Sequence, residues 1–516
     1  MAFKSSKHQN VQPVHMVLNG GLNYSQTPSN LQDNEVRRAH NFIYDAQTDS
    51  LITRPGTDCL TASALGSPIL AGYYYERSVT EAYHVCASGG KLWYLVGDTY
   101  TEIGALNDST TVPSFLTFNT LLLIADGGAD IKTWNGAVSG TYTTIPDSPA
   151  ATALSMIKNR VVCNASDEPD SVYLSGPEDE ADWDTVAGNA VGLRAGFGDM
   201  LTVNAFGVFG DDLIVSKKGD QAKRIYRINV ADATPANWYV EEKSSNNAAK
   251  NAQSMVGAWN NVFFVDENGF KSILGVDVYG DLQVDYTGRK INTVFVPTNI
   301  CDFTNYLPAL NSIWFGLGDR VFCYTERFDP QGGNRVPAFT DILFKQDRIR
   351  SAYQAGDYIY LCGHNGYLYK LDDTLATDET EPAVTADYVS IIRTKTLVFG
   401  GDGILKKLQW YLRPKNGGEA KLYAYKDEET AVALKTVTLT SEGTELYDAN
   451  GDFSDDAGPP ENDITGYLYD EGSYAWVETS RSRVRHPQMA FEIYVTSGRV
   501  GVEWVKAEIA MVEGGE

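Results

Sequence analysis

The sequence predicts an all-β protein: a β-propeller of about seven blades, a C-terminal antiparallel β-sandwich domain and an extended N-terminal arm. Three observations predict it: a hairpin pattern that occurs seven times, continuous apolar runs, and a composition typical of turn-rich β proteins. The 516 residues are too many for one hydrophobic core, so we expect several domains. With 43% hydrophobic residues, 47 glycines and 30 tyrosines, the chain should fold with little helix.

The recurring hairpin is clearest in residues 260–274, NNVFFVDENGFKSIL, which predict two short strands joined by a tight turn at Asn268-Gly269. Each copy has a polar turn, an apolar run, a tip containing Gly, Asp or Asn, and a second strand rich in aromatic residues. The copies cover residues 81–96, 119–135, 159–175, 211–228, 260–274, 311–325 and 357–372. Their starts lie 38 to 52 residues apart, close to the roughly 40 to 50 residues of a four-stranded propeller blade.

Apolar runs such as residues 121–124 and 262–265 are continuous rather than alternating. This is expected of inner strands that neighbouring blades cover on both faces. The alternative is a large β-sandwich or mixed all-β protein whose hairpins are alike only because hairpins generally are. The regular spacing favours the propeller.

The division into domains follows changes of pattern along the chain. We expect residues 1–60 to form the arm and a first hairpin, residues 61–398 the propeller, and residues 399–516 the C-terminal platform domain. The arm is polar and without periodicity. The last part alternates at period two, as in residues 407–412, 420–425, 491–495 and 500–505, which is typical of antiparallel strands with one wet face.

The formal net charge of −25 argues against tight nucleic-acid binding over the general surface, although a conduit for DNA is compatible with it. The chain has no run of 18 apolar residues, and its N-terminus lacks the apolar region of a signal peptide. We therefore expect synthesis in a cytoplasm and no membrane insertion. The six cysteines form no CxxC pair or Cys/His cluster, which indicates buried reduced thiols.

One N-terminal series of motifs resembles a known family. It runs Gly20-Gly21-Leu22-Asn23, Thr27-Pro28, a polar stretch containing Glu35, then Asn41-Phe42, a hairpin and Arg54-Pro55-Gly56. This order is similar to the start of the tail-hub proteins of short-tailed bacteriophages, also called packaged-DNA stabilisation or tail-nozzle proteins. Two later passages agree with it, residues 133–136 (TWNG) and residues 172–175 (VYLS) followed by Asp182-Trp183.

The resemblance implies a structural virion protein of the phage tail, made in the host cytoplasm. It implies a homo-oligomeric ring of about six copies below the portal and its adaptor. Such a ring forms part of the DNA conduit, through which DNA passes without sequence-specific binding. It also carries tail fibres, spikes or a plug.

The alternative from another class is a propeller-type protein that binds or degrades polysaccharide. A lectin propeller should repeat its ligand-binding residues, but the hairpin tips SGG, DGG, DEP, KGD, ENG, GD and HNG share no aromatic or acid. Carboxylate pairs such as Glu178 and Asp179 are expected by chance among 67 acidic residues, and no Gly-x-Ser-x-Gly motif occurs. We therefore predict no enzyme activity, no catalytic residues and no cofactor.

One loop resembles a metal site. Asp448, Asn450 and Asp452 place oxygen ligands at alternate positions around Gly451, as in calcium loops. The glycine comes two places early for an EF-hand, and its twelfth position would be Pro459. A plain acidic loop is the alternative, and we assign no metal.

Five arginines are candidates for contacts between subunits or rings: Arg37 and Arg38 in the arm, and Arg481, Arg483 and Arg485, which alternate along one strand. The last three can instead pair with the acidic middle of their own domain, which we favour. Six copies would carry about 150 negative charges, so ring closure needs such pairs to offset repulsion. Residues 217–224 (KKGDQAKR) are a basic hairpin tip that can face DNA, face an acidic partner, or be a solvated turn.

Overall fold

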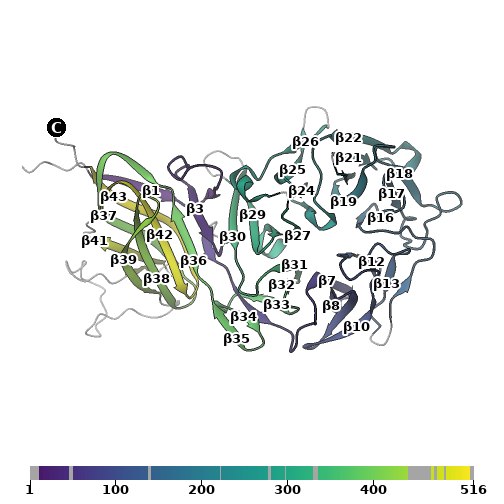
Figure 1. The fold of residues 1–516 in the computed structure, drawn as a ribbon, viewed down its shortest axis with the longest axis horizontal. Coiled ribbons are helices and arrows are strands. Elements are labelled where there is room, and N and C mark those ends of the chain that lie inside the picture. The colour runs from purple at the N-terminus through teal and green to yellow at the C-terminus, as the bar shows by residue number, and fades with distance from the viewer. Residues whose placement is uncertain are drawn as a thin grey trace, which may run out of the picture.

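Strands account for nearly all regular structure in this computed structural model, which describes residues 11–45, 50–137, 141–220, 222–276, 281–296, 298–328, 335–439, 467–469, 474–480 and 484–511. Over those ranges the helical elements are short 3-10 turns, namely η1 (Pro235–Asn237), η2 (Ala252–Ser254), η3 (Arg289–Val294) and η4 (Pro308–Leu310). The all-β prediction is confirmed. Two bodies lie side by side, a ring of sheets and a smaller β body (Figure 1).

Five separate four-stranded antiparallel sheets make most of the ring. They are built from consecutive strands: β7 (Ile69–Ser78), β8 (Glu81–Ser88), β9 (Lys91–Val96), β10 (Thr99–Ala105); β11 (Ser114–Phe118), β12 (Leu121–Ala125), β13 (Lys132–Trp134), β14 (Thr143–Thr144); β15 (Leu154–Ile157), β16 (Arg160–Asn164), β17 (Ser171–Leu174), β18 (Val191–Arg194); β19 (Thr202–Phe209), β20 (Asp212–Lys218), β21 (Lys223–Asn229), β22 (Tyr239–Ser244); β23 (Met255–Ala258), β24 (Asn261–Asp266), β25 (Gly269–Val276), β26 (Asp281–Asp285).

Two further units complete the ring as parts of larger sheets. The first is β27 (Cys301–Leu307), β28 (Ser312–Leu317), β29 (Arg320–Phe328) and β30 (Arg335–Ile342). The second is β31 (Ile349–Ala355), β32 (Tyr358–Gly363) and β33 (Leu368–Asp372), followed by the hairpin β34 (Thr377–Glu381) and β35 (Val384–Asp387). The first strand of each unit contacts that of the next, and β31 contacts β7. The ring is therefore closed, and the β-propeller prediction is confirmed (Figure 1).

All seven predicted hairpins are present, each as the second and third strand of its unit. The turn of the reference hairpin is shifted by one residue from the prediction. Asp266 pairs with Gly269, so the two turn residues are Glu267 and Asn268 rather than Asn268 and Gly269.

The smaller body contains β36 (Ser390–Thr394), β37 (Leu397–Pro414), β38 (Gly418–Lys426), β39 (Thr430–Leu439), β40 (Tyr467–Tyr469), β41 (Tyr474–Ser480), β42 (Arg485–Ser497) and β43 (Val500–Met511). One group pairs in the order β36, β42, β38, β39, and another in the order β40, β41, β37, β43. The start of β37 also pairs with β42. Side chains of both groups share one core, which includes Trp410, Leu422, Phe491 and Val505.

The described residues between 11 and 59 differ from the expected extended arm, because their strands are paired into both bodies. In the smaller body, β1 (Val11–Val17) pairs with β43 along its whole length, and β3 (Glu35–His40) pairs with β36. The strand β2 (Gly21–Leu22) pairs with β3, and the hairpin β4 (Phe42–Tyr44) and β5 (Leu51–Thr53) reaches β43. In the ring, β6 (Gly56–Cys59) lies between β33 and β34.

The structure places the predicted domain boundaries inside structural units. The boundary between residues 398 and 399 falls within β37, and the boundary between residues 60 and 61 separates β6 from the ring that it completes. The reason is that the partners of these N-terminal strands lie far away in the sequence, where local composition gives no sign of them. One hydrophobic cluster runs from Trp410 through Val36 to Phe339 and Phe270, so the two bodies share a continuous core.

None of the helical elements in the described ranges is long and apolar enough to cross a membrane. All six cysteines are described and free; five are buried and Cys59 is partly buried. The expectation of buried reduced thiols is thus confirmed for five of them.

Candidate functional site

The N-terminal motif residues meet at the joint between the two bodies. The buried Glu35 carboxylate accepts a hydrogen bond of 2.9 Å from the Asn23 amide, and Lys290 of the ring lies 3.2 Å from it. Gly21 has a φ of +72°, and a Cβ at this position would lie 2.6 Å from the backbone nitrogen of Phe339. A residue without a side chain is therefore required where the N-terminal segment passes β30.

Arg54 is the anchor of the Arg-Pro-Gly motif. Its guanidinium donates two hydrogen bonds to Asp378, of 2.8 and 2.6 Å, and both side chains are fully buried. The guanidinium also lies 4.5 Å from the ring of Phe344 and 3.7 Å from that of Tyr388, and its Nε donates to Asn41. Buried charges persist when paired and hydrogen-bonded in this way. The pair thereby fixes the start of β6 against β34.

A bulge in β3 places two of the predicted interface residues on one side. The register pairs Val36 with Thr394 and Arg38 with Arg393, so Arg37 is an extra residue in β3. In a regular strand, consecutive side chains point to opposite faces, whereas a bulge lets them share one. Arg37 and Arg38 consequently line the same groove.

We call this hollow the arginine groove. It has a volume of about 450 Å³ and lies between the N-terminal segment, the ring and the smaller body. Its principal side chains are Tyr24, Arg37, Arg38, Arg320, Arg393 and Tyr425. Arg37 and Arg38 are among the predicted interface residues, whereas Arg320 and Arg393 are not, because these lie on β29 and β36 and no local pattern in the sequence connects them.

The four arginines differ in their partners. Arg393 donates to Glu492 at 2.7 Å and lies 3.6 Å from the centre of the Tyr425 ring. Arg320 contacts the buried Asp341 at 3.6 Å. Within the described residues, Arg37 and Arg38 take part in no ion pair; Arg37 lies over the ring of Tyr24 at 5.8 Å.

Carboxylates and a neutral phenol accompany the arginines of the groove. Burial and the Asp341 carboxylate raise the pKa of Tyr24 to about 12, against the opposing effect of the nearby arginines, so this phenol stays neutral. Asp427 and Glu428 also line the groove. The Asp427 carboxylate accepts backbone hydrogen bonds within its own turn, which lowers its pKa. Glu492 and Asp341 pair with Arg393 and Arg320, and Asp427 and Glu428 bring the carboxylates near the four guanidinium groups to four.

Of the other predicted interface and metal residues, the structure describes Arg485. Arg485 pairs with Asp402 at 2.7 Å on an exposed part of the smaller body, an ion pair within the chain. Arg481 and Arg483 lie outside the described residues, and so do the calcium candidates Asp448, Asn450 and Asp452. Elsewhere in the described ranges, no group of three or more His, Cys, Asp or Glu side chains is arranged to hold a metal ion.

The basic hairpin tip at residues 217–224 is paired with acidic residues rather than being a free cationic surface. Lys217 is buried and contacts Asp199 at 2.6 Å. Arg224 contacts Glu242 on the neighbouring strand at 2.6 Å.

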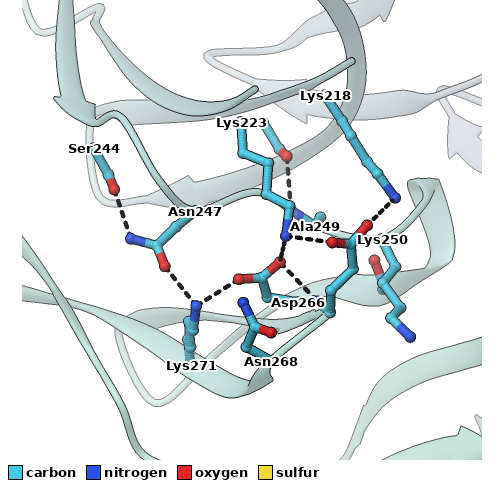
Figure 2. A network of polar contacts seen from close by, with 12 residues as sticks. Lys218, Lys223, Ser244, Asn247, Ala249, Lys250, Asp266, Asn268 and Lys271 are labelled. Carbon is cyan, nitrogen blue, oxygen red and sulfur yellow. Dashed lines mark hydrogen bonds and ion pairs between the residues drawn. The ribbon is translucent and has the colours of Figure 1, made fainter. Parts of the chain in front are cut away.

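The remaining lysines of the tip reach the next sheet of the ring. Lys218 contacts Glu267 at 3.0 Å, and Lys223 contacts both Asp266 and Glu267, at 2.9 and 2.7 Å. Lys223 and Lys271 converge on Asp266 (Figure 2). Hydrogen bonds from Lys223 and Lys218 lower the pKa of Glu267 to about 2. The network thus links two neighbouring sheets through their turns.

A second hollow, the aromatic groove, has a volume of about 1130 Å³ beside β23 and β26. Trp259, Tyr286, Asp285, Glu326 and Arg289 line it. Trp259 occupies a turn position with a φ of 48°, a left-handed conformation that costs a bulky residue about 1 to 2 kcal/mol. Aromatic and acidic side chains in one groove are a combination that can bind sugars.

No protein-family model matches the chain, and no curated protein does. Several solved structures resemble it. The computationally designed Ika8 protein is 11% identical, covering 61% of this chain and 99% of its own, with a TM-score of 0.33. BamB from Moraxella catarrhalis is 10% identical, covering 62% and 97%, with a TM-score of 0.36. The β-propeller domain of Myceliophteria thermophila Cps50 (Swd1) is 9% identical, covering 60% and 98%, with a TM-score of 0.39.

Proposed function

We propose that this chain is a structural protein of a bacteriophage tail, of the tail-hub kind that its N-terminal motifs resemble. One observation carries the proposal: the motif residues are buried in two polar contacts, Asn23 with Glu35 and Asn41 with Arg54, that tie the N-terminal segment to the ring. Together with the pairing of β1 and β3 in the smaller body, these contacts make the N-terminal segment a connection between the two bodies. A rigid two-body unit suits a load-bearing assembly.

In this proposal the propeller has seven blades, the last formed by β31–β33 and completed by β6. The smaller body is a two-layered sandwich that acts as the platform of a ring of about six copies. The ring lies below the portal and its adaptor, lets DNA pass without sequence-specific binding, and carries fibres, spikes or a plug. The chain is made in the host cytoplasm, becomes part of the virion tail and has no enzyme activity.

Purified phage particles test the proposal. Mass spectrometry of these particles should detect the chain in a fixed ratio to the portal protein. Particles made without its gene should have heads that fail to retain DNA, and a plasmid copy should restore retention. Particles that lack the chain, or that assemble and infect normally after deletion of its gene, would contradict the proposal.

The aromatic groove supports a second candidate function, the binding of polysaccharide. The strained position of Trp259 and the nearby Asp285 and Glu326 favour it. The test is binding of host surface polysaccharide to the full chain, measured by calorimetry. The control is Tyr358→Ala, which removes an exposed aromatic side chain that does not line the groove. A polysaccharide that binds the parent chain and the Tyr358→Ala variant, but not the Trp259→Ala variant, would establish this function. Equal binding by the parent and both variants, or no binding by any of them, would exclude it.

A further inference from the structure

Near the start of β25, the amine of Lys271 lies between a carboxylate and a carboxamide (Figure 2). Its Nζ donates one hydrogen bond of 2.5 Å to Oδ2 of Asp266 and another of 2.5 Å to Oδ1 of Asn247. The amide nitrogen of Asn247 in turn donates to the Ser244 hydroxyl at 2.6 Å. These bonds orient the carboxamide so that its carbonyl group is directed at the lysine.

The amine and the carboxylate are shielded from water. The side chains of Lys271 and Asp266 are 4% and 1% exposed, and the centre of the Tyr286 ring lies 4.9 Å from Nζ. Holding a nucleophile against an acyl group in a fixed geometry removes much of the entropic cost of their reaction. An amine becomes such a nucleophile once it has lost its proton.

The network around this amine has one more ammonium group than carboxylates. Lys218 and Lys223 contact Glu267. Lys223 and Lys271 contact Asp266. Three lysines thus share two carboxylates, and the loss of one proton leaves the set neutral. A charge costs most where water is most excluded, and the side chain of Lys271 is the least exposed of the three, at 4% against 17% for Lys223 and 31% for Lys218.

We infer that Lys271 and Asn247 form an intramolecular amide bond, with Asp266 as the proton carrier. The ammonium group gives a proton to Asp266, and the resulting amine attacks Cγ of Asn247. The Nζ–Cγ bond forms, and the electron pair of the Cγ–Nδ2 bond leaves with Nδ2. Two protons pass from Nζ to Nδ2, which departs as ammonium. Both nitrogens are on one carbon during this step, so the carboxyl group that contacts Nζ is also next to Nδ2.

The second sheet of the ring contains a similar ion pair without the carboxamide. Lys132 donates to both carboxylate oxygens of Asp126, at 2.9 and 2.7 Å, and its side chain is 10% exposed. Over the described ranges, no side-chain amide accepts a hydrogen bond from it. Lys132 therefore provides a control within the same chain, a shielded lysine with a carboxylate partner but no acyl group to attack.

The bond would fasten the connection between the fourth and fifth sheets to the fifth sheet itself. Asn247 lies between β22 and η2, and Lys271 follows it by 24 positions. A covalent link that closes a loop of this length restricts the unfolded chain, as a disulfide does.

The intact mass of the purified full chain tests the inference. Loss of ammonia should lower this mass by about 17 Da from the value expected from the sequence. In a tryptic digest, the link should hold residues 244–250 to residues 251–289 in one branched product that is not cleaved after Lys271.

Three variants give the expected pattern. Asn247→Ala should keep its full mass, because the acyl group is gone while the pair of Lys271 and Asp266 remains. Asp266→Asn should slow the loss of ammonia about a hundredfold or more, because the proton carrier is gone. The control Lys132→Arg should show the same deficit and the same branched product as the parent. Circular dichroism checks that each variant is folded, and Lys271→Arg, which keeps the positive charge, replaces Asn247→Ala if that variant misfolds.

A parent chain that keeps its full mass would overturn the inference, as would a deficit that persists in Asn247→Ala. A deficit within one linear peptide would also overturn it, because a succinimide at an Asn-Gly site such as Asn268-Gly269 loses the same mass. A loss of about 18 Da, with the link between Lys271 and Asp266, would make Asp266 the acyl donor and likewise reject it.

Discussion

Arg54 and Asp378 form a fully buried, bidentate ion pair between residues 324 positions apart in the sequence. The pair holds β6 beside β34, so that an N-terminal strand completes the last sheet of the ring. The closed ring and the attachment of the smaller body both depend on this N-terminal segment.

Asp378→Asn should destabilise the protein by about 3 to 5 kcal/mol, because it leaves the Arg54 charge buried without its counter-ion. Urea unfolding followed by tryptophan fluorescence measures the loss. The control is Glu81→Gln in the exposed Arg77–Glu81 pair, which should cost less than about 1 kcal/mol. Equal effects of the two substitutions would show that the buried pair is not the anchor.

Gly56→Ala should weaken the packing of β6 against β34, because the added methyl group overpacks this contact. A Cβ at Gly56 would lie 2.2 Å from the carbonyl oxygen of Thr377, a backbone atom that cannot move aside. We expect a loss of about 1 to 3 kcal/mol and faster proteolysis of the N-terminal segment. Gly66→Ala is the matched control, since nothing lies within 4 Å of its added Cβ. A thermal midpoint equal to that of the control would contradict the prediction.

His84 should make ring closure sensitive to acid. It lies between the first and last units of the ring, where its Nδ1 is 3.0 Å from the Tyr353 hydroxyl, and burial lowers its pKa from 6.5 to about 4. The unfolded chain therefore binds this proton below pH 6.5, and the folded chain only near pH 4. The contribution to stability is complete above pH 6.5 and decreases as the pH falls towards 4, by up to about 3 kcal/mol.

An NMR titration of the histidine ring protons measures the pKa of His84 directly. The variant His84→Phe should show a shallower loss of stability between pH 6.5 and 4 than the parent. A native pKa near 6.5, or an unchanged slope in the variant, would exclude this role.

Thiol reactivity should follow burial. Burial raises the pKa of Cys301 to about 12, and Cys86, Cys163, Cys323 and Cys362 are likewise buried. In the native protein these five should resist a thiol reagent such as DTNB, leaving at most Cys59 to react, and all six should react in denaturant. Rapid reaction of several thiols in the native state would show that the ring opens far more readily than its packing indicates.

The recurring part of the fold could be predicted because it is local. Turns between the first and second strands of several units need a positive φ, and residues such as Asn119, Asn159, Asn260 and Asn311 supply it. These are the polar positions at which the predicted hairpins start. The displaced turn at Glu267-Asn268 shows the limit of such prediction: Asn-Gly favours a turn, but the pairing of Asp266 with Gly269 sets its centre one residue earlier.

The joint and the groove could be predicted only in part, because their partners are distant in sequence. Arg37 and Arg38 were recognised from their charge, yet the bulge that gathers them depends on β36. Nothing near Arg54 indicates that Asp378 neutralises it. Likewise, β1 has no pattern that would distinguish an arm from a strand paired with β43.

The most direct test of the central claim is an averaged electron cryo-microscopy image of the phage particle's tail. The account predicts a ring of about six copies below the portal and adaptor, with each smaller body in the ring and its propeller at the periphery. A tail whose density has no place for this two-body unit would contradict the account.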